Sequence, residues 1–82
     1  MNVRFLLCEK DKYSLVGYMQ IRDFDIFMRF LQDAKDNEWD IGINTEDIVD
    51  TDTDIYTVHS FEFVVPKVGG ELLPHIAVYL EG

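Results

Sequence analysis

The stretch DFDIFMRFLQDAKDN, residues 23–37, carries the clearest structural signal in the sequence. Its first residue, Asp23, can accept hydrogen bonds from the free backbone N–H groups of a helical turn, which predicts a helix from about Phe24 to Asn37. Apolar residues recur along it at spacings of three and four, as in a helix with one buried side. The predicted buried stripe comprises Phe24, Phe27, Met28, Leu31 and Ala34, with Ile26 and Phe30 widening it.

Two apolar segments, residues 3–9 and 13–21, precede this helix. The polar residues Lys10-Asp11-Lys12 separate them, which predicts a β-hairpin with a short loop. The expected cross-strand pairs are Glu9 with Tyr13, Leu7 with Leu15, Phe5 with Gly17 and Val3 with Met19. The reverse face would then be more apolar than a face exposed to water needs to be. It would carry Arg4, Leu6, Cys8, Val16 and Tyr18.

The segment after the helix alternates apolar with polar or small residues. Trp39, Ile41 and Ile43 take the apolar positions, which predicts a short, half-buried strand with these side chains facing the core. Thr45 can then cap a single helical turn over Glu46–Val49.

A long β-prone stretch, Asp54–Val65, follows. Its alternation changes phase near His59 and Ser60, and a β-bulge there would bring the apolar side chains back to one face. The bulge would place Tyr56 and Val58 on the face of Phe61.

The end of the chain predicts a second hairpin. Pro66 ends the long strand, Gly69-Gly70 predicts a turn, and residues 72–81 return as the last strand. The expected pairs are Val65 with Leu72, Phe63 with Pro74 and Phe61 with Ile76. Because Pro74 has no N–H to give to a neighbouring strand, its strand should lie at a sheet edge or be broken there.

These elements fit one compact domain, residues 1–82, because a chain of this length has room for one core and one helix layer. The predicted fold class is α+β: a small antiparallel sheet of four to five strands, built from two hairpins, with one main α-helix packed on one face. The single cysteine excludes an internal disulfide, and the sequence predicts neither a secretory signal nor a membrane span. We therefore expect a cytoplasmic protein.

The acidic residues are concentrated in one part of the chain. Seven Lys and Arg stand against sixteen Asp and Glu, giving a net charge of −9, which argues against nucleic acid and anionic membranes as direct ligands. Residues 36–66, which we call the acidic window, contain nine acids and no Lys or Arg. A chain that needed acids only for solubility would intersperse the two signs. The distribution favours a surface for a positively charged partner.

The leading hypothesis is a small, non-enzymatic acidic binding protein, an inhibitor or modulator, that presents the acidic window to a basic partner such as a nucleic-acid-processing enzyme. Small inhibitors that mimic DNA, including several from bacteriophages, are similar to it in size and charge, a likeness of composition and not of motif. A partly exposed Trp39 would anchor such an interface, although its alternation with Ile41 and Ile43 favours the core. The candidate partner-binding residues are Asp36, Glu38, Trp39, Asp40, Glu46, Asp47, Asp50, Asp52 and Asp54.

The spacing of Asp50, Asp52 and Asp54 matches the first three ligand positions of a calcium loop. The rest of the motif is missing, because Ile55 stands where the sharp turn needs Gly and Phe61 stands where a bidentate Glu is required. We therefore expect no metal site, and the sequence predicts no cofactor.

Cys8 with His59 or His75 would be the candidates for nucleophilic catalysis. No local motif surrounds Cys8, whose apolar neighbours favour a small buried side chain over an activated thiolate. His59, at the expected bulge, is the more interesting histidine because bulges redirect side chains. We predict no catalytic residues and no enzymatic activity.

Two alternative functions remain. The protein could self-associate, for example as a homodimer, through the apolar reverse face around Leu6, Val16 and Tyr18 or through an exposed edge strand. Less favoured is a small metal-dependent enzyme that uses the acids at positions 50–54.

Overall fold

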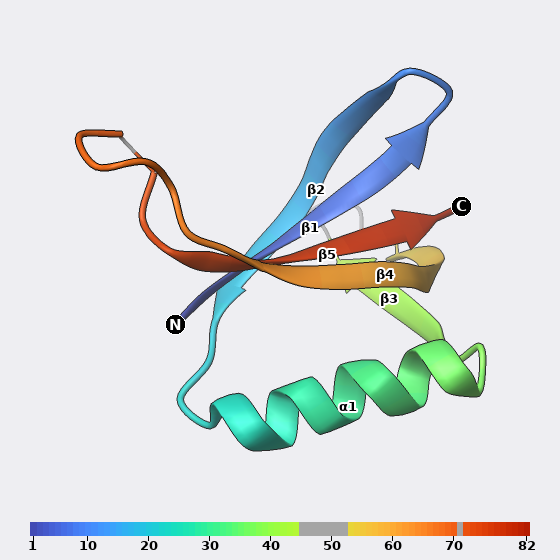
Figure 1. Ribbon diagram of the computed structural model, residues 1–82. Coiled ribbons are helices and arrows are strands. Elements are labelled where there is room, and N and C mark those ends of the chain that lie inside the picture. The colour runs from blue at the N-terminus through green and yellow to red at the C-terminus, as the bar shows by residue number, and fades with distance from the viewer. Residues whose placement is uncertain (45–52, 71) are drawn as a thin grey trace.

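The computed structural model describes residues 1–44, 53–70 and 72–82. In these ranges the chain forms one helix packed on one five-stranded sheet, as shown in Figure 1. The elements are β1 (Asn2–Glu9), β2 (Lys12–Gln20), α1 (Phe24–Asp36), β3 (Asp40–Asn44), β4 (Thr53–Val64) and β5 (His75–Glu81). The predicted α+β class, with a single helix on one face of a sheet, is confirmed.

The sheet is mixed, whereas the sequence predicted a purely antiparallel sheet. Its strand order is β2-β1-β5-β4-β3, and the central pair, β1 and β5, is parallel. The two hairpins thus join through the first and last strands of the chain. Parallel strands need a long crossover connection, and here the intervening chain includes α1. Strand periodicity carries no signal for such a distant pairing, so the sequence could not predict it.

The first hairpin has the expected register only near the chain's beginning. Phe5 pairs with Gly17 as predicted, but a bulge between Phe5 and Leu6 shifts the outer pairs by one residue. Glu9 therefore pairs with Lys12 and leaves a two-residue loop, the commonest hairpin length. The extra residue, Val16, packs against the core instead of lying on the reverse face.

The bulge predicted in β4 is confirmed at His59. Val58 pairs with Leu80 and Ser60 pairs with Tyr79, so His59 is left between the two pairs. The consequence for packing is also as expected: the side chains that share the core face are Tyr56, Val58 and Phe61.

The predicted pairing of the last two strands is wrong by two residues. Phe63 pairs with Ile76 instead of Pro74, and Val65 and Leu72 lie outside the strands. β5 is a central strand that begins only after Pro74, which has no N–H to contribute to a ladder. A shift of two residues preserves the alternation of faces, which is why the pattern of apolar residues did not exclude the wrong register.

α1 begins where predicted. The Asp23 Oδ1 accepts a hydrogen bond from the Ile26 backbone N–H at 3.0 Å. Leu31 and Ala34 are fully buried, whereas Ile26 is 65% exposed. The helix therefore buries a narrower stripe than its apolar residues would allow.

The core lies between α1 and the sheet. It consists of Val3, Phe5, Leu31, Ala34, Val58, Ile76, Val78 and Leu80. The sheet curls so strongly that its two edge strands approach each other: a Cβ built on Gly17 of β2 would lie 3.3 Å from Ile43 Cγ2 of β3. A residue larger than Gly at position 17 would push against this contact.

The strand predicted from Trp39 to Asn44 is confirmed as β3, which begins one residue later, at Asp40. Its apolar residues Ile41 and Ile43 pack against the core. The helical turn predicted over Glu46–Val49, with its cap Thr45, lies outside the described residues. Within the described ranges, no helix is long and apolar enough to cross a membrane.

Candidate functional site

The C-terminal end of α1 brings together the first candidate residues of the acidic window. Asn37 caps the helix, and its backbone N–H donates to the Asp33 carbonyl. Glu38 then adopts a left-handed conformation, with φ of 54°, and the Trp39 N–H donates back to the Ala34 carbonyl at 3.0 Å. This closing bond defines a Schellman-type helix end, where Gly is the usual left-handed residue.

The alternation of Trp39 with Ile41 and Ile43 favoured a core position, but the structure places Trp39 at the surface. Its side chain is 46% exposed, and its ring centroid lies 6.2 Å from that of Phe30, itself 44% exposed. Trp39 precedes β3 and is oriented by the helix end, so the alternation that buries Ile41 and Ile43 does not extend to it.

Three exposed acids surround this tryptophan in the chain: Asp36, Glu38 and Asp40. Asp36 Oδ1 accepts a hydrogen bond from Gln32 Nε2 at 2.9 Å. In the described part of the chain, the ion pairs within 4.0 Å are Lys12 with Glu9 and Glu81 with His59. The carboxylates beside Trp39 are therefore not neutralised by a close basic partner.

Asp54, another candidate, lies away from this helix end. Asp54 pairs with Ile43, whereas Asp40 pairs with Thr57, so the two acids project from opposite faces of the β3–β4 ribbon. They are separated by about 10 Å along the strands, given a rise of roughly 3.3 Å per residue. The candidates Glu46, Asp47, Asp50 and Asp52 lie outside the described residues.

A cavity of about 600 Å³ lies between the β1–β2 turn and the bulged region of β4 and β5. Sequence reasoning found only the bulge. The wall from the first hairpin comprises Cys8, Glu9, Lys10, Asp11, Lys12 and Tyr13. The opposite wall comprises His59, Ser60, Glu62, Tyr79 and Glu81.

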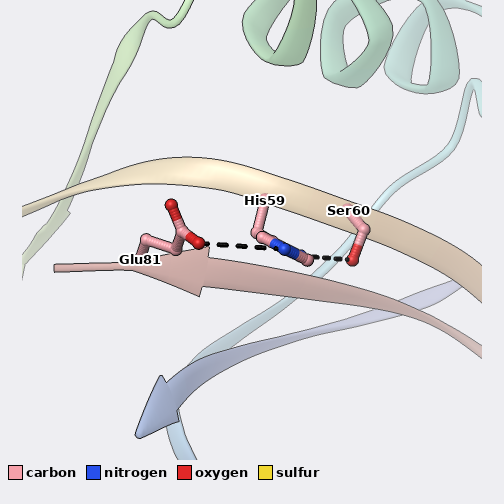
Figure 2. Close-up of polar contacts among 3 residues, drawn as sticks. All are labelled: His59, Ser60 and Glu81. Atoms are coloured by element: carbon pink, nitrogen blue, oxygen red, sulfur yellow. Dashed lines mark hydrogen bonds and ion pairs between the residues drawn. The ribbon is translucent and has the colours of Figure 1, made fainter.

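Figure 2 shows how the bulge orders polar groups on the second wall. His59 Nδ1 lies 3.0 Å from Ser60 Oγ, and His59 Nε2 lies 3.8 Å from Glu81 Oε1. A hydroxyl, an imidazole and a carboxylate in sequence are the groups of nucleophilic hydrolysis. Here the 3.8 Å between His59 Nε2 and Glu81 Oε1 exceeds a hydrogen bond, and both side chains are more than half exposed. Glu81 therefore does not hold the imidazole as the carboxylate of a catalytic triad does.

Tyr79 is held in the cavity wall by a hydrogen bond and by a contact with a second aromatic ring. Its hydroxyl donates to Glu62 Oε1 at 2.6 Å. This hydrogen bond, followed by burial and the charge of Glu62, raises the pKa of Tyr79 to about 12. Its ring lies 5.2 Å from the ring of Tyr13, at an angle of 53°. The two rings and the carboxylate come from three different strands.

The two remaining candidates for catalysis are a half-buried cysteine and a buried histidine. Burial, and secondarily the charge of Glu81, raise the pKa of the Cys8 thiol, which favours its protonated form. His75 is only 5% exposed, and its Nδ1 lies 2.9 Å from the Leu73 carbonyl oxygen. Because that oxygen only accepts, His75 donates from Nδ1 and holds the chain at the start of β5.

A second hollow, of about 480 Å³, connects the helix end with the bulge. Its lining residues are Lys35, Glu38, Thr57, Val58, His59 and Glu81. His59 and Glu81 thus border both hollows. In Figure 1, the β1–β2 turn, the C-terminal end of β5 and the end of α1 all lie toward the right of the molecule.

The metal hypothesis finds no support among the described residues, which contain no group of three or more potential ligands placed to hold a metal ion. Asp50 and Asp52, two of the three acids of the incomplete calcium loop, lie outside them.

Comparisons with known proteins give no further indication of function. No model of a known protein family matches the chain, and no curated protein or solved structure is significantly similar to it.

Proposed function

We propose that the protein is a small acidic binding protein, an inhibitor or modulator, that presents its acidic window to a basic surface of a partner protein. One observation carries the proposal: Trp39 is 46% exposed and stands among three exposed carboxylates at the end of α1. A large aromatic side chain with a charged rim is the usual composition of an interface anchor.

The placement of the acids supports a role in binding over a role in stability. The C-terminal end of a helix carries a partial negative charge, so acids there are unfavourable by about 0.3–1 kcal/mol each. Asp36 and Glu38 occupy this end. Glu38 also occupies a left-handed backbone position that Gly would adopt more easily. Acids in these positions place negative charge beside Trp39, with Lys35 as the base of the last helical turn.

The basic surface that fits best is the nucleic-acid-binding surface of a partner protein. Such a surface is built to accept closely spaced phosphates, and carboxylates can occupy the same positions. The acids at positions 50, 52 and 54 would be spaced by roughly 6.5–7 Å in an extended chain, comparable to a row of phosphates. The net charge of −9 favours competition with nucleic acid for the partner and disfavours direct binding to it.

The test uses matched charge variants. Glu38→Gln with Asp40→Asn removes two charges beside Trp39, and Asp25→Asn with Asp33→Asn removes two exposed charges elsewhere on α1. Partners are captured from cell extract on wild-type protein and on both variants, and a captured partner is then titrated against each. Because Trp39 is the only tryptophan, its fluorescence reports directly on contact.

We expect Trp39 emission to shift to shorter wavelength as the partner binds. Binding should weaken with added salt, and duplex DNA should displace the protein from the partner. The pair beside Trp39 should weaken binding much more than the control pair. Equal losses would mean that only total charge matters, and an unchanged Trp39 spectrum in a complex would contradict the proposed interface.

Self-association is a second candidate, favoured by exposed apolar side chains on the sheet face opposite α1, which we call the open face. There Tyr13, Leu15 and Tyr18 of the edge strand β2 are 65%, 52% and 72% exposed. Sedimentation in low and high salt separates the two candidates: apolar self-association should persist in high salt, whereas an acidic contact should not.

A further inference from the structure

We propose that the cavity between the β1–β2 turn and the bulge of β4 is a binding site for a guanidinium group, such as an arginine side chain of a partner. The inference rests on the proposed function for the source of this group, since a basic partner would supply it. The geometry of the site supports it independently of that source, and binding can be tested without the partner.

The two tyrosine rings provide the first requirement for binding a cation. Tyr13 and Tyr79 both line the cavity, with ring centroids 5.2 Å apart. Tyr13 is 65% exposed, so its ring is accessible from the cavity. A guanidinium group stacks favourably on such aromatic rings, more readily than the compact ammonium group of lysine.

Carboxylates provide the second requirement. Glu62 is held by the 2.6 Å hydrogen bond from Tyr79 to its Oε1. A carboxylate has about four acceptor positions, so Glu62 keeps capacity for a planar, two-pronged donor. Glu81 lines the same wall, with its Oε1 3.8 Å from His59 Nε2.

The balance of charge favours a cation over an anion. Four carboxylates and two lysines line the cavity. One of the lysines, Lys12, already lies 3.8 Å from Glu9 Oε2. The acids of the β4–β5 wall, Glu62 and Glu81, stand with no lysine or arginine on that wall. An anionic ligand would have to approach these two carboxylates, which like-charge repulsion opposes.

Size and position are also compatible. A cavity of about 600 Å³ is within the range of roughly 300–1,000 Å³ for small-ligand sites. His59 and Glu81 also border the hollow that contains Glu38. A basic partner seated at Trp39 could therefore extend one side chain past the bulge into the cavity.

The probe is Nα-acetyl-arginine amide, titrated into the intact protein while NMR follows the rings of Tyr13 and Tyr79. Saturable shifts are expected with this probe, and neither the uncharged citrulline analogue nor inorganic phosphate should reproduce them. Glu62→Gln keeps an acceptor for Tyr79 but removes the charge, and should weaken binding about tenfold or more. Asp33→Asn removes one charge from the exposed side of α1 and should have no effect.

Two variants of Tyr13 separate stacking from structure. Tyr13→Ala should weaken binding by about fivefold, whereas Tyr13→Phe keeps the ring and should bind as wild type does. Because Tyr13 is exposed, both variants should fold, which circular dichroism checks. If phosphate binds in place of the arginine probe, or if Glu62→Gln and Asp33→Asn behave alike, the inference is wrong.

The result of the arginine-probe titration can be distinguished from the result of the partner-capture test. Replacing Trp39 with Ala should abolish partner capture and leave the binding of the arginine probe unchanged. Absence of saturable shifts in wild-type protein would overturn the guanidinium site but would leave the Trp39 interface to be judged on its own fluorescence test.

Discussion

The two faces of the sheet are built from the same strands but carry different kinds of side chain. On the face beneath α1, Val3, Val78 and Leu80 are completely buried. On the open face, the intervening positions of the sheet carry exposed Tyr13 and the Tyr79–Glu62 hydrogen bond. One face is therefore defined by apolar packing and the other by aromatic and ionisable groups. Substitutions on the face covered by α1 should therefore change folding, whereas substitutions on the open face should change binding.

The largest effect on stability is expected from a substitution in the core between α1 and the sheet. Leu31 of α1 is fully buried, so Leu31→Ala should lower the free energy of unfolding by about 2–5 kcal/mol through lost burial and a residual cavity. For a domain this small, that is a large fraction of its stability. Urea denaturation followed by circular dichroism measures the change.

Ile26 provides the matched control on the same helix. It is 65% exposed, so Ile26→Ala should change the free energy of unfolding by only about 0.5 kcal/mol. Similar losses for both substitutions would contradict the distinction between a buried and an open side of α1.

A smaller effect is expected from the Tyr79–Glu62 hydrogen bond on the open face. Because the pKa of Tyr79 is raised to about 12 from an ordinary value near 10, the neutral phenol is stabilised in the folded state. This contribution is complete below pH about 10 and is lost as the pH rises toward 12. Absorbance of the phenolate should therefore show a tyrosine that titrates near pH 12. The pKa of Tyr56 is also raised, by burial and by the charges of Asp54 and Glu9, so variants are needed to assign the transition.

The assignment of that late titration is checked with Glu62→Gln. Removing the charged acceptor should lower the pKa of Tyr79 and diminish the loss of stability at alkaline pH. Tyr79→Phe should remove the transition near pH 12. A transition near pH 12 that survives in Tyr79→Phe would belong to another tyrosine and would contradict the role of this hydrogen bond.

Local signals in the sequence predicted the elements well, because each depends on neighbouring residues. The cap at Asp23 and the phase change at His59 are examples, and both features are present. The parallel pairing of β1 with β5 depends on residues at the two ends of the chain, for which periodicity gives no information. The wrong register of the last hairpin arose because a two-residue shift leaves the faces unchanged.

The same limit applies to the candidate site. The acids beside Trp39 were found because they are adjacent in sequence, although exposure of the tryptophan depends on the helix end. The cavity was missed because Tyr13 and Tyr79 meet only through the arrangement of β2, β1 and β5 in the sheet. The acids that lie outside the described residues remain sequence predictions.

Glu38, at the C-terminal end of α1, is exposed and occupies a backbone position that is unfavourable to stability. Glu38 has a φ of 54°, so Glu38→Gly should relieve strain and raise the free energy of unfolding by up to about 1 kcal/mol. Glu38→Ala keeps the Cβ and should gain less. If Glu38→Gly is more stable and also binds the partner less tightly, the residue serves binding at some expense of stability.

The smallest effect is expected from Cys8, which tests whether the open face contains a reactive group. Its side chain is half-buried, and its raised pKa keeps the thiol protonated at neutral pH. Cys8→Ser replaces a weakly polar thiol with a hydroxyl of similar shape, so the protein should fold normally and keep its partner and probe binding. Thermal unfolding and the two binding titrations measure this. A variant that folds normally but loses binding would show that the thiol acts in function, and the open face would then combine recognition with chemistry.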